Sequence, residues 1–137
     1  MYNIGAISYS NNSGLGTMIK GYRDNFLDSQ LVIKHSIKGT YPISIPHTFG
    51  DMSLTDEQIN NYLDICKPDV VIIIETPFNF NLFKILYDRG VKVVVVPMVD
   101  SIEYKKFEPY LPYITKFWMP TKWGYDFYKE IVFLIFM

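Results

Sequence analysis

The chain has 137 residues and a formal net charge of −1; 49% of its residues are hydrophobic and 20% are charged. This balance is typical of a folded domain and excludes the profile of a disordered chain. It also lacks the excess of basic residues that neutralises phosphates, so we expect no nucleic-acid partner.

Cys66 is the only cysteine, so a disulfide within the chain is excluded and a reducing compartment is favoured. The start of the chain does not have the pattern of a signal peptide, and its apolar runs are well short of the roughly 20 residues that cross a bilayer. We therefore expect a cytoplasmic protein without a transmembrane segment.

The first half of the chain begins with a buried strand over Ile4–Tyr9, followed by the polar, glycine-containing segment SNNSGLG at residues 10–16. Apolar residues spaced by four and three predict a helix next; they are Leu15, Ile19, Tyr22 and Phe26. A second strand is predicted at Leu31–Ile33. Residues 37–53 are irregular, with a short strand expected at Ile43–Ile45.

A helix is then predicted with Thr55 as its cap, Gln58 completing a capping box, and Pro68 ending it. Its apolar stripe consists of Ile59, Tyr62, Leu63 and Cys66. The β-branched run Val70–Ile74 predicts a strand buried on both faces, as in a parallel sheet.

The remaining elements continue the same alternation, with Gly90 expected to stop the third helix. In order, they are a helix at Asn79–Arg89, a strand at Val91–Val96, a short helix near Tyr104–Tyr110, a strand at Thr115–Met119, and a helix at Trp123–Glu130 capped by Thr121. Strands alternating with helices predict an α/β fold: a single Rossmann-like domain with an open, mostly parallel sheet and helices on both faces. Ligands bind such sheets beyond the carboxyl ends of the strands.

Residues after the first strand are candidates for substrate binding. Glycines let a ligand approach the backbone closely, and the start of the next helix favours phosphate or a sugar hydroxyl. The candidates are Ser13, Gly14, Leu15 and Gly16. Ile19 stands where the dinucleotide motif G-x-G-x-x-G has its third glycine, and no Walker sequence is present. A turn that binds nothing is the alternative.

Acidic residues follow two of the later strands. Glu75 comes directly after Val70–Ile74, where it can act as a base, hold a sugar hydroxyl or cap backbone N–H groups. Asp100 follows Val91–Val96 and is a candidate carboxylate or a helix-start residue. Their polar neighbours are further candidates for substrate binding: Thr76, Asn79 and Ser101.

The remaining candidate side chains are two phenylalanines, the cysteine and the two histidines. Phe78 and Phe80 can stack on a sugar ring, although core packing is expected of at least one of them. Cys66 is expected to be a buried apolar residue. His35 and His47 are isolated, and the sequence has no cluster with metal-ligand spacing.

Four segments in order resemble the N-terminal domain of a GT-B-fold glycosyltransferase of the glycogen-synthase-like family. They are IGAISYSNNSGLG, KPDVVIIIETPFN, VKVVVVPMVDS and ITKFWMPTKWGYDFYK. The resemblance implies transfer of a sugar from a nucleotide diphosphate sugar to an acceptor hydroxyl, without a cofactor or bound metal. It implies that Gly14 and Gly16 lie near the donor phosphates and that Glu75 falls near the position that faces the acceptor. Glu75 or Asp100 is expected to orient the acceptor hydroxyl as the catalytic carboxylate. Pro120, Thr121 and Trp123 match a late, mainly structural segment of the family.

The resemblance covers residues 1–130 and departs from the family in length. The family's second domain, which binds most of the donor, has no counterpart here, and the apolar tail at residues 131–137 is expected to mark a truncation. We therefore expect little activity without a second half-domain. The alternative is a free-standing Rossmann-like binding or interaction module that forms a homodimer or docks on a partner through the tail.

Overall fold

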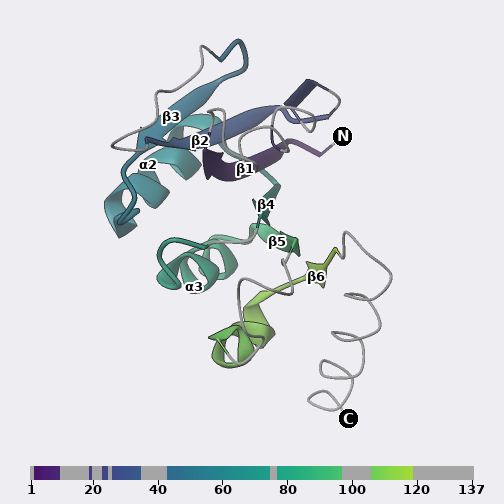
Figure 1. The fold of residues 1–137 in the computed structure, drawn as a ribbon. Helices are drawn as coiled ribbons and strands as arrows, with labels where there is room; N and C mark the ends of the chain where they lie inside the picture. Colours follow the sequence, from purple (N-terminus) through teal and green to yellow (C-terminus); the bar gives the residue numbers. More distant parts are fainter. Residues whose placement is uncertain are drawn as a thin grey trace.

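The computed structural model describes residues 2–9, 19, 23–24, 26–34, 43–74, 77–96 and 106–118 (Figure 1). Several predicted features lie outside these residues: most of the helix after the first strand, the helix at 123–130 with its cap, and the tail at 131–137.

In the part of the chain that the structure describes, six strands form one open sheet in the order β3-β2-β1-β4-β5-β6, and every neighbouring pair is parallel. Their bounds are β1 (Ile4–Tyr9), β2 (Ser29–Ile33), β3 (His47–Gly50), β4 (Val70–Ile74), β5 (Lys92–Val96) and β6 (Lys116–Phe117). This confirms the predicted fold class, an α/β domain of the Rossmann-like type. The run VVIII is buried along almost its whole length, as a central parallel strand requires.

Helix α2 (Asp56–Cys66) forms as its local sequence predicts. Gln58 N–H donates to Thr55 Oγ1 over 3.2 Å, and Thr55 N–H donates to Gln58 Oε1 over 3.1 Å, which completes the capping box. The predicted stripe is buried: Ile59, Tyr62, Leu63 and Cys66. Lys67 ends the helix in the left-handed region at φ 48°, directly before Pro68.

Helix α3 (Asn81–Asp88) and the 3₁₀-helix η2 (Glu108–Tyr113) begin later than expected. Asn79 occupies the turn before α3, where its side chain accepts from the Asn81 N–H. The sequence Glu108-Pro109 places a proline in the first turn of η2, where its missing N–H is least costly. Gly90 follows α3 with φ +73°, as its predicted stop position requires.

The prediction of a strand at Ile43–Ile45 was wrong, because β3 begins after Pro46. The Pro46 carbonyl accepts a hydrogen bond from Gln30 N–H at 3.1 Å, and the ladder with β2 runs from His47 onward. Proline has no N–H to offer a sheet, so it suits the residue before the strand. β2 also begins two residues earlier than predicted and includes two buried polar residues, Ser29 and Gln30.

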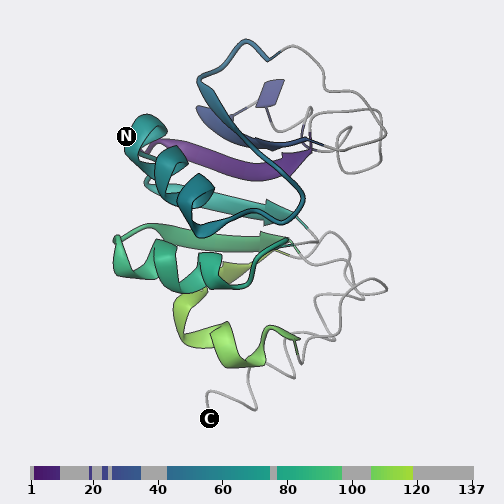
Figure 2. The same ribbon diagram turned by 90° about the vertical axis from the view of Figure 1, so that its left-hand side faces the viewer.

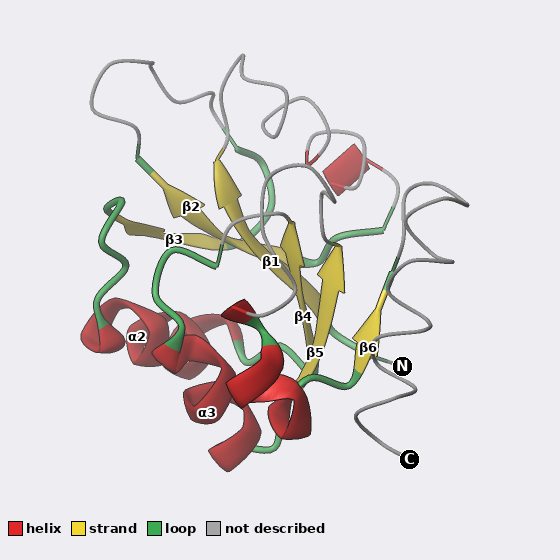
Figure 3. Cartoon of the chain, turned by 60° about the horizontal axis from the view of Figure 1, so that its bottom comes forward, coloured by secondary structure: helices red, strands yellow, loops and turns green. Residues whose placement is uncertain are grey.

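The two faces of the sheet carry separate cores. Helices α2 and α3 lie side by side over one face, with η2 beside them (Figures 2 and 3). That face contributes Ile7, Leu31, Ile73 and Val95 to the larger core. The opposite face carries a smaller cluster, formed by strand residues together with Ile19 and Leu27. Its strand residues are Ala6, Ile72, Ile74 and Val96.

Gly5 in β1 allows Tyr62 to lie close against the strand. A Cβ at this position would lie 1.9 Å from Tyr62 Oη. The Tyr62 hydroxyl is hydrogen-bonded to Ser29 Oγ at 2.8 Å. Burial of the ring raises the pKa of Tyr62, and the hydrogen bond to Ser29 opposes that rise. Absence of a side chain at Gly5 thus allows α2 to dock on β1.

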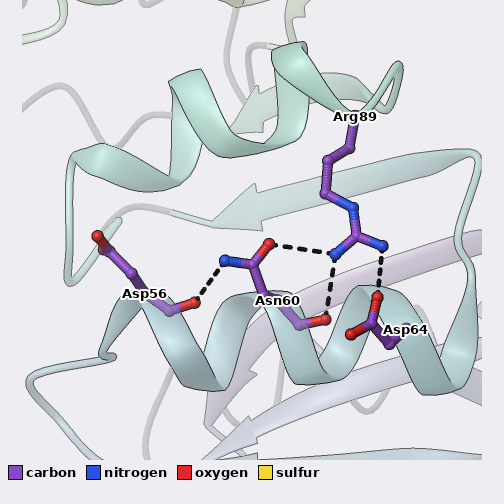
Figure 4. A network of polar contacts seen from close by, with 4 residues as sticks. All are labelled: Asp56, Asn60, Asp64 and Arg89. Atoms are coloured by element: carbon purple, nitrogen blue, oxygen red, sulfur yellow. Dashed lines mark hydrogen bonds and ion pairs between the residues drawn. The ribbon is translucent and has the colours of Figure 1, made fainter.

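Arg89 fastens the end of α3 to the middle of α2 (Figure 4). One guanidinium nitrogen lies 3.2 Å from the Asn60 carbonyl oxygen and 3.1 Å from Asn60 Oδ1, and the other lies 2.6 Å from Asp64 Oδ1. The Arg89 and Asp64 side chains are 36% and 66% exposed, so solvent weakens the charge attraction. Through this fork geometry Arg89 contacts three oxygens of α2 and links the two helices.

A candidate ligand site at the switch point

The strand order changes direction at β1: β2 and β3 lie on one side of it, and β4, β5 and β6 lie on the other. Ile4 to Ile7 of β1 pair with Val70 to Ile73 of β4, so the two strands end at the same edge. The strand arrows of β1, β4 and β5 point to the same side in Figure 3. In open parallel sheets this arrangement leaves a crevice beyond the strand ends, and ligands bind there.

Most of the predicted site residues lie outside the described residues: Ser13, Gly14, Leu15, Gly16, Glu75, Thr76, Asp100 and Ser101. The structure does describe the ends of the strands that precede these residues. Residue 10 follows Tyr9 at the end of β1, residue 75 follows Ile74 at the end of β4, and residue 97 follows Val96 at the end of β5. The three segments therefore depart from adjacent strands at one edge.

Asn79 is the predicted site residue that the structure does describe, and its side chain ties α3 to α2. Its Nδ2 lies 2.8 Å from the Leu54 carbonyl oxygen and 2.8 Å from Asp56 Oδ1. Its Oδ1 accepts from the Asn81 N–H at 3.0 Å. Both polar atoms of the amide are thus bonded within the protein. Substrate binding by Asn79 stays a prediction.

The turn after β4 has an unusual backbone at Phe78, where φ is +66°. The Asn79 N–H donates to the Pro77 carbonyl oxygen at 2.7 Å, so the hydrogen bond spans only two residues. A γ-turn with a positive central φ is rare and strained, and the left-handed region costs a residue with a side chain about 1–2 kcal/mol. The turn is therefore held in place by its surroundings.

Tyr9 and Phe78 meet where β1 and β4 end, with ring centroids 5.4 Å apart and planes at 87°. Tyr9 Oη also lies 4.0 Å from Met52 Sδ, after β3. Phe80 instead packs between the rings of Phe83, Phe107 and Tyr110, so it serves the core. Sequence reasoning missed Tyr9 and Met52; an aromatic residue at the end of an apolar strand was the available signal for Tyr9.

The Asp51 carboxylate, which follows β3 near this edge, is held by local hydrogen bonds. Bonds from Ser53 lower the pKa of Asp51, helped by the Gln58 amide and opposed by partial desolvation. Cys66 lies at the far end of α2, where burial raises the pKa of its thiol, as befits the packed residue that was predicted. Among the residues described, no three His, Cys, Asp or Glu side chains gather as a metal site.

The opposite edge of the sheet holds a hollow of about 360 Å³ between the ends of α2 and α3. It is lined by residues that precede β4 and β5: Leu63, Asp64, Lys67, Pro68, Asp69, Arg89, Gly90 and Val91. Arg89 and Asp64 are already paired there. The switch point, not this hollow, adjoins the predicted site residues.

The comparisons with known proteins identify no relative. No protein-family model, curated protein or solved structure matches this chain. Over the described residues, no helix is long and apolar enough to span a membrane.

Proposed function

We propose that this domain binds a nucleotide diphosphate sugar at the switch point and serves as the N-terminal half of a cytoplasmic glycosyltransferase. The observation that carries the proposal is the position of β1 between β2 and β4, with all described strands parallel. This order brings the ends of β1 and β4 together, and the glycine segment and Glu75 follow those ends directly. The family resemblance of the four sequence segments supplies the reaction.

In this proposal the backbone at Gly14 and Gly16 holds the donor phosphates, since glycine leaves N–H groups accessible to an anion. Ser13 and Leu15 complete that loop. Helix-end N–H groups can stabilise the leaving diphosphate as negative charge develops. Glu75 or Asp100 orients the acceptor hydroxyl, with Thr76 and Ser101 beside them in the sequence.

Asn79 supports this site by holding the turn at Pro77–Asn79, which follows Glu75 in the sequence. Its amide is bonded to Leu54 and Asp56, at the start of α2, and to Asn81, at the start of α3. The strained Phe78 lies between Asn79 and β4. A side chain that fixes a turn beside a reacting group influences catalysis through geometry, because small misplacements are costly.

Calorimetry with UDP-glucose, ADP-glucose and GDP-mannose at millimolar concentration tests the proposal. We expect saturable binding of at least one donor. Gly16→Ala adds a methyl group where phosphate is proposed to contact the backbone, and should weaken binding about tenfold, equivalent to ~1.4 kcal/mol. Gly90→Ala is the matched control, because Gly90 lies at the opposite edge and its Cβ would meet no atom within 4 Å.

Two results would contradict the proposal. One is the absence of binding heat with all three donors at millimolar concentration. The other is unchanged affinity of the Gly16→Ala variant, which would place the ligand elsewhere.

A further inference from the structure

Two buried polar side chains near the end of β1 carry oxygen atoms without a hydrogen-bond partner. Ser8 in β1 is 1% exposed, and Gln30 in β2 is 0% exposed. Neither Ser8 Oγ nor Gln30 Oε1 has a partner within the described structure. Buried polar atoms in folded proteins are nearly always paired, so two such atoms on neighbouring strands require an explanation.

The two side chains lie on the same face of the sheet. Gln30 pairs with Ala6 in the parallel ladder, and Ser8 is two residues beyond Ala6 along β1. Side chains two residues apart on a strand point to the same face. That face carries the smaller core cluster, with Ile19 and Leu27, and not α2 or α3.

Hydrogen bonds also bring the Gln30 carboxamide next to Ser8. Gln30 Nε2 lies 3.3 Å from the Ser8 carbonyl oxygen and 3.3 Å from the Tyr9 carbonyl oxygen. Two carbonyl oxygens require a donor opposite them, which fixes the orientation of the amide group. The atom left unpaired on Gln30 is therefore its oxygen, which can only accept.

The hydrogen-bonding capacity of these two oxygen atoms limits which chemical group can bind to both. Gln30 Oε1 needs a donor, whereas the Ser8 hydroxyl can both donate and accept. A phosphate or carboxylate would be repelled by Gln30 Oε1, and an apolar group would leave both oxygens unpaired. An O–H group satisfies both, because its hydrogen can go to Gln30 while its oxygen accepts from Ser8.

We propose that Gln30 and Ser8 bind a single O–H group at the end of β1, on the face of the sheet opposite α2. The group has two sources. An internal water fits the complete burial of the pair. A hydroxyl of a sugar or ribose fits the nearby switch point, and this second source rests on the proposed function.

The Ser8→Ala variant tests the pair with little change in volume. Ser29→Ala is the reference, since Ser29 is equally buried in a neighbouring strand and its Oγ is bonded to Tyr62 Oη at 2.8 Å. Thermal unfolding without ligand and calorimetry with UDP-glucose are measured for wild type and both variants. Loss of a real hydrogen bond should lower the melting temperature of Ser29→Ala by about 3 °C or more.

An equal drop for Ser8→Ala supports the site and assigns an internal water. A melting temperature that is unchanged or raised, together with affinity for UDP-glucose weakened about two- to twelvefold, supports the site and assigns a ligand hydroxyl.

A Ser8→Ala variant that is as stable as wild type or more stable, and shows no loss of affinity, overturns the site, because the hydroxyl was then truly unpaired. Failure of the proposed function is a separate result, in which the wild-type protein binds no donor. The melting temperature of Ser8→Ala would still show whether an internal water is bound to the pair.

Discussion

Gly5→Ala is expected to be the most disruptive single-methyl change in the described part of β1. The new Cβ would lie 1.9 Å from Tyr62 Oη, 2.9 Å from Ser29 Oγ and 3.2 Å from Pro68 Cβ. The closest contact cannot be relieved by a flexible side-chain end, because the ring of Tyr62, a residue of α2, is fully buried in the core. The ring must therefore move, and α2 with it.

The magnitude follows from two effects. Adding a methyl group to a filled core costs about 1–3 kcal/mol. Displacing the Tyr62 hydroxyl from Ser29 adds about 1 kcal/mol for the broken hydrogen bond. We expect the free energy of unfolding to fall by about 2–4 kcal/mol, a large share of the ~5–15 kcal/mol typical of a domain. Urea denaturation followed by circular dichroism measures this change.

A second variant identifies the cause. Tyr62→Phe removes the atom that the new Cβ would approach most closely, at the cost of the bond to Ser29. In the double variant Gly5→Ala/Tyr62→Phe the clash at 1.9 Å is absent. We expect its loss of stability to be smaller than the sum of the two single losses by about 1–2 kcal/mol. If the losses of the two single variants add up to that of the double variant within ~0.5 kcal/mol, the reasoning is refuted, because the clash with Tyr62 would then not cause the destabilisation.

Two further predictions concern the backbone and pH. Gly90→Ala should lower the free energy of unfolding by about 1 kcal/mol through its φ of +73° alone, whereas Lys67→Gly, at φ 48°, should raise it by about 0.5–1 kcal/mol. Urea denaturation at one pH measures both changes. Changes of the same sign in the two variants would contradict the account. Because burial raises the pKa of Tyr62, the folded state favours the neutral phenol, and its contribution to stability is complete below the ordinary value of 10.0 and declines as the pH rises above it. Tyr62→Phe should flatten that alkaline decline, and an unchanged pH profile would count against the assignment.

Sequence reasoning succeeded where the signal was local. The capping box of Thr55 and Gln58 uses residues three apart, so it can be read without knowledge of the fold. The run Val70–Ile74 indicated burial on both faces, and with the alternation of elements it predicted the parallel sheet. Gly90 was predicted as the stop of α3 for the same reason, since the left-handed position belongs to the helix end itself.

Long-range contacts were beyond the reach of the sequence. The position of β3 depends on pairing with β2, so the apolar residues before Pro46 gave the wrong segment. The partners of the Asn79 amide nitrogen lie 23 and 25 residues away, at Asp56 and Leu54 around the start of α2, and no local pattern indicates them. A polar residue inside an apolar strand, such as Ser8 or Gln30, was visible in the sequence, but only the sheet register shows that the two are neighbours.

The bonds of Arg89 have a consequence for how this scaffold tolerates change. They join α3 to α2 at the end of the sheet remote from Tyr9 and Phe78, and they involve no residue that follows β1, β4 or β5 at the switch point. In the described residues, this anchor is separate from the contacts by which Asn79 and Phe80, after β4, join the helical layer. Insertions or randomised residues within 10–16 should therefore be accepted as long as the buried Ile19 is kept, which makes this domain a suitable host for grafted recognition loops.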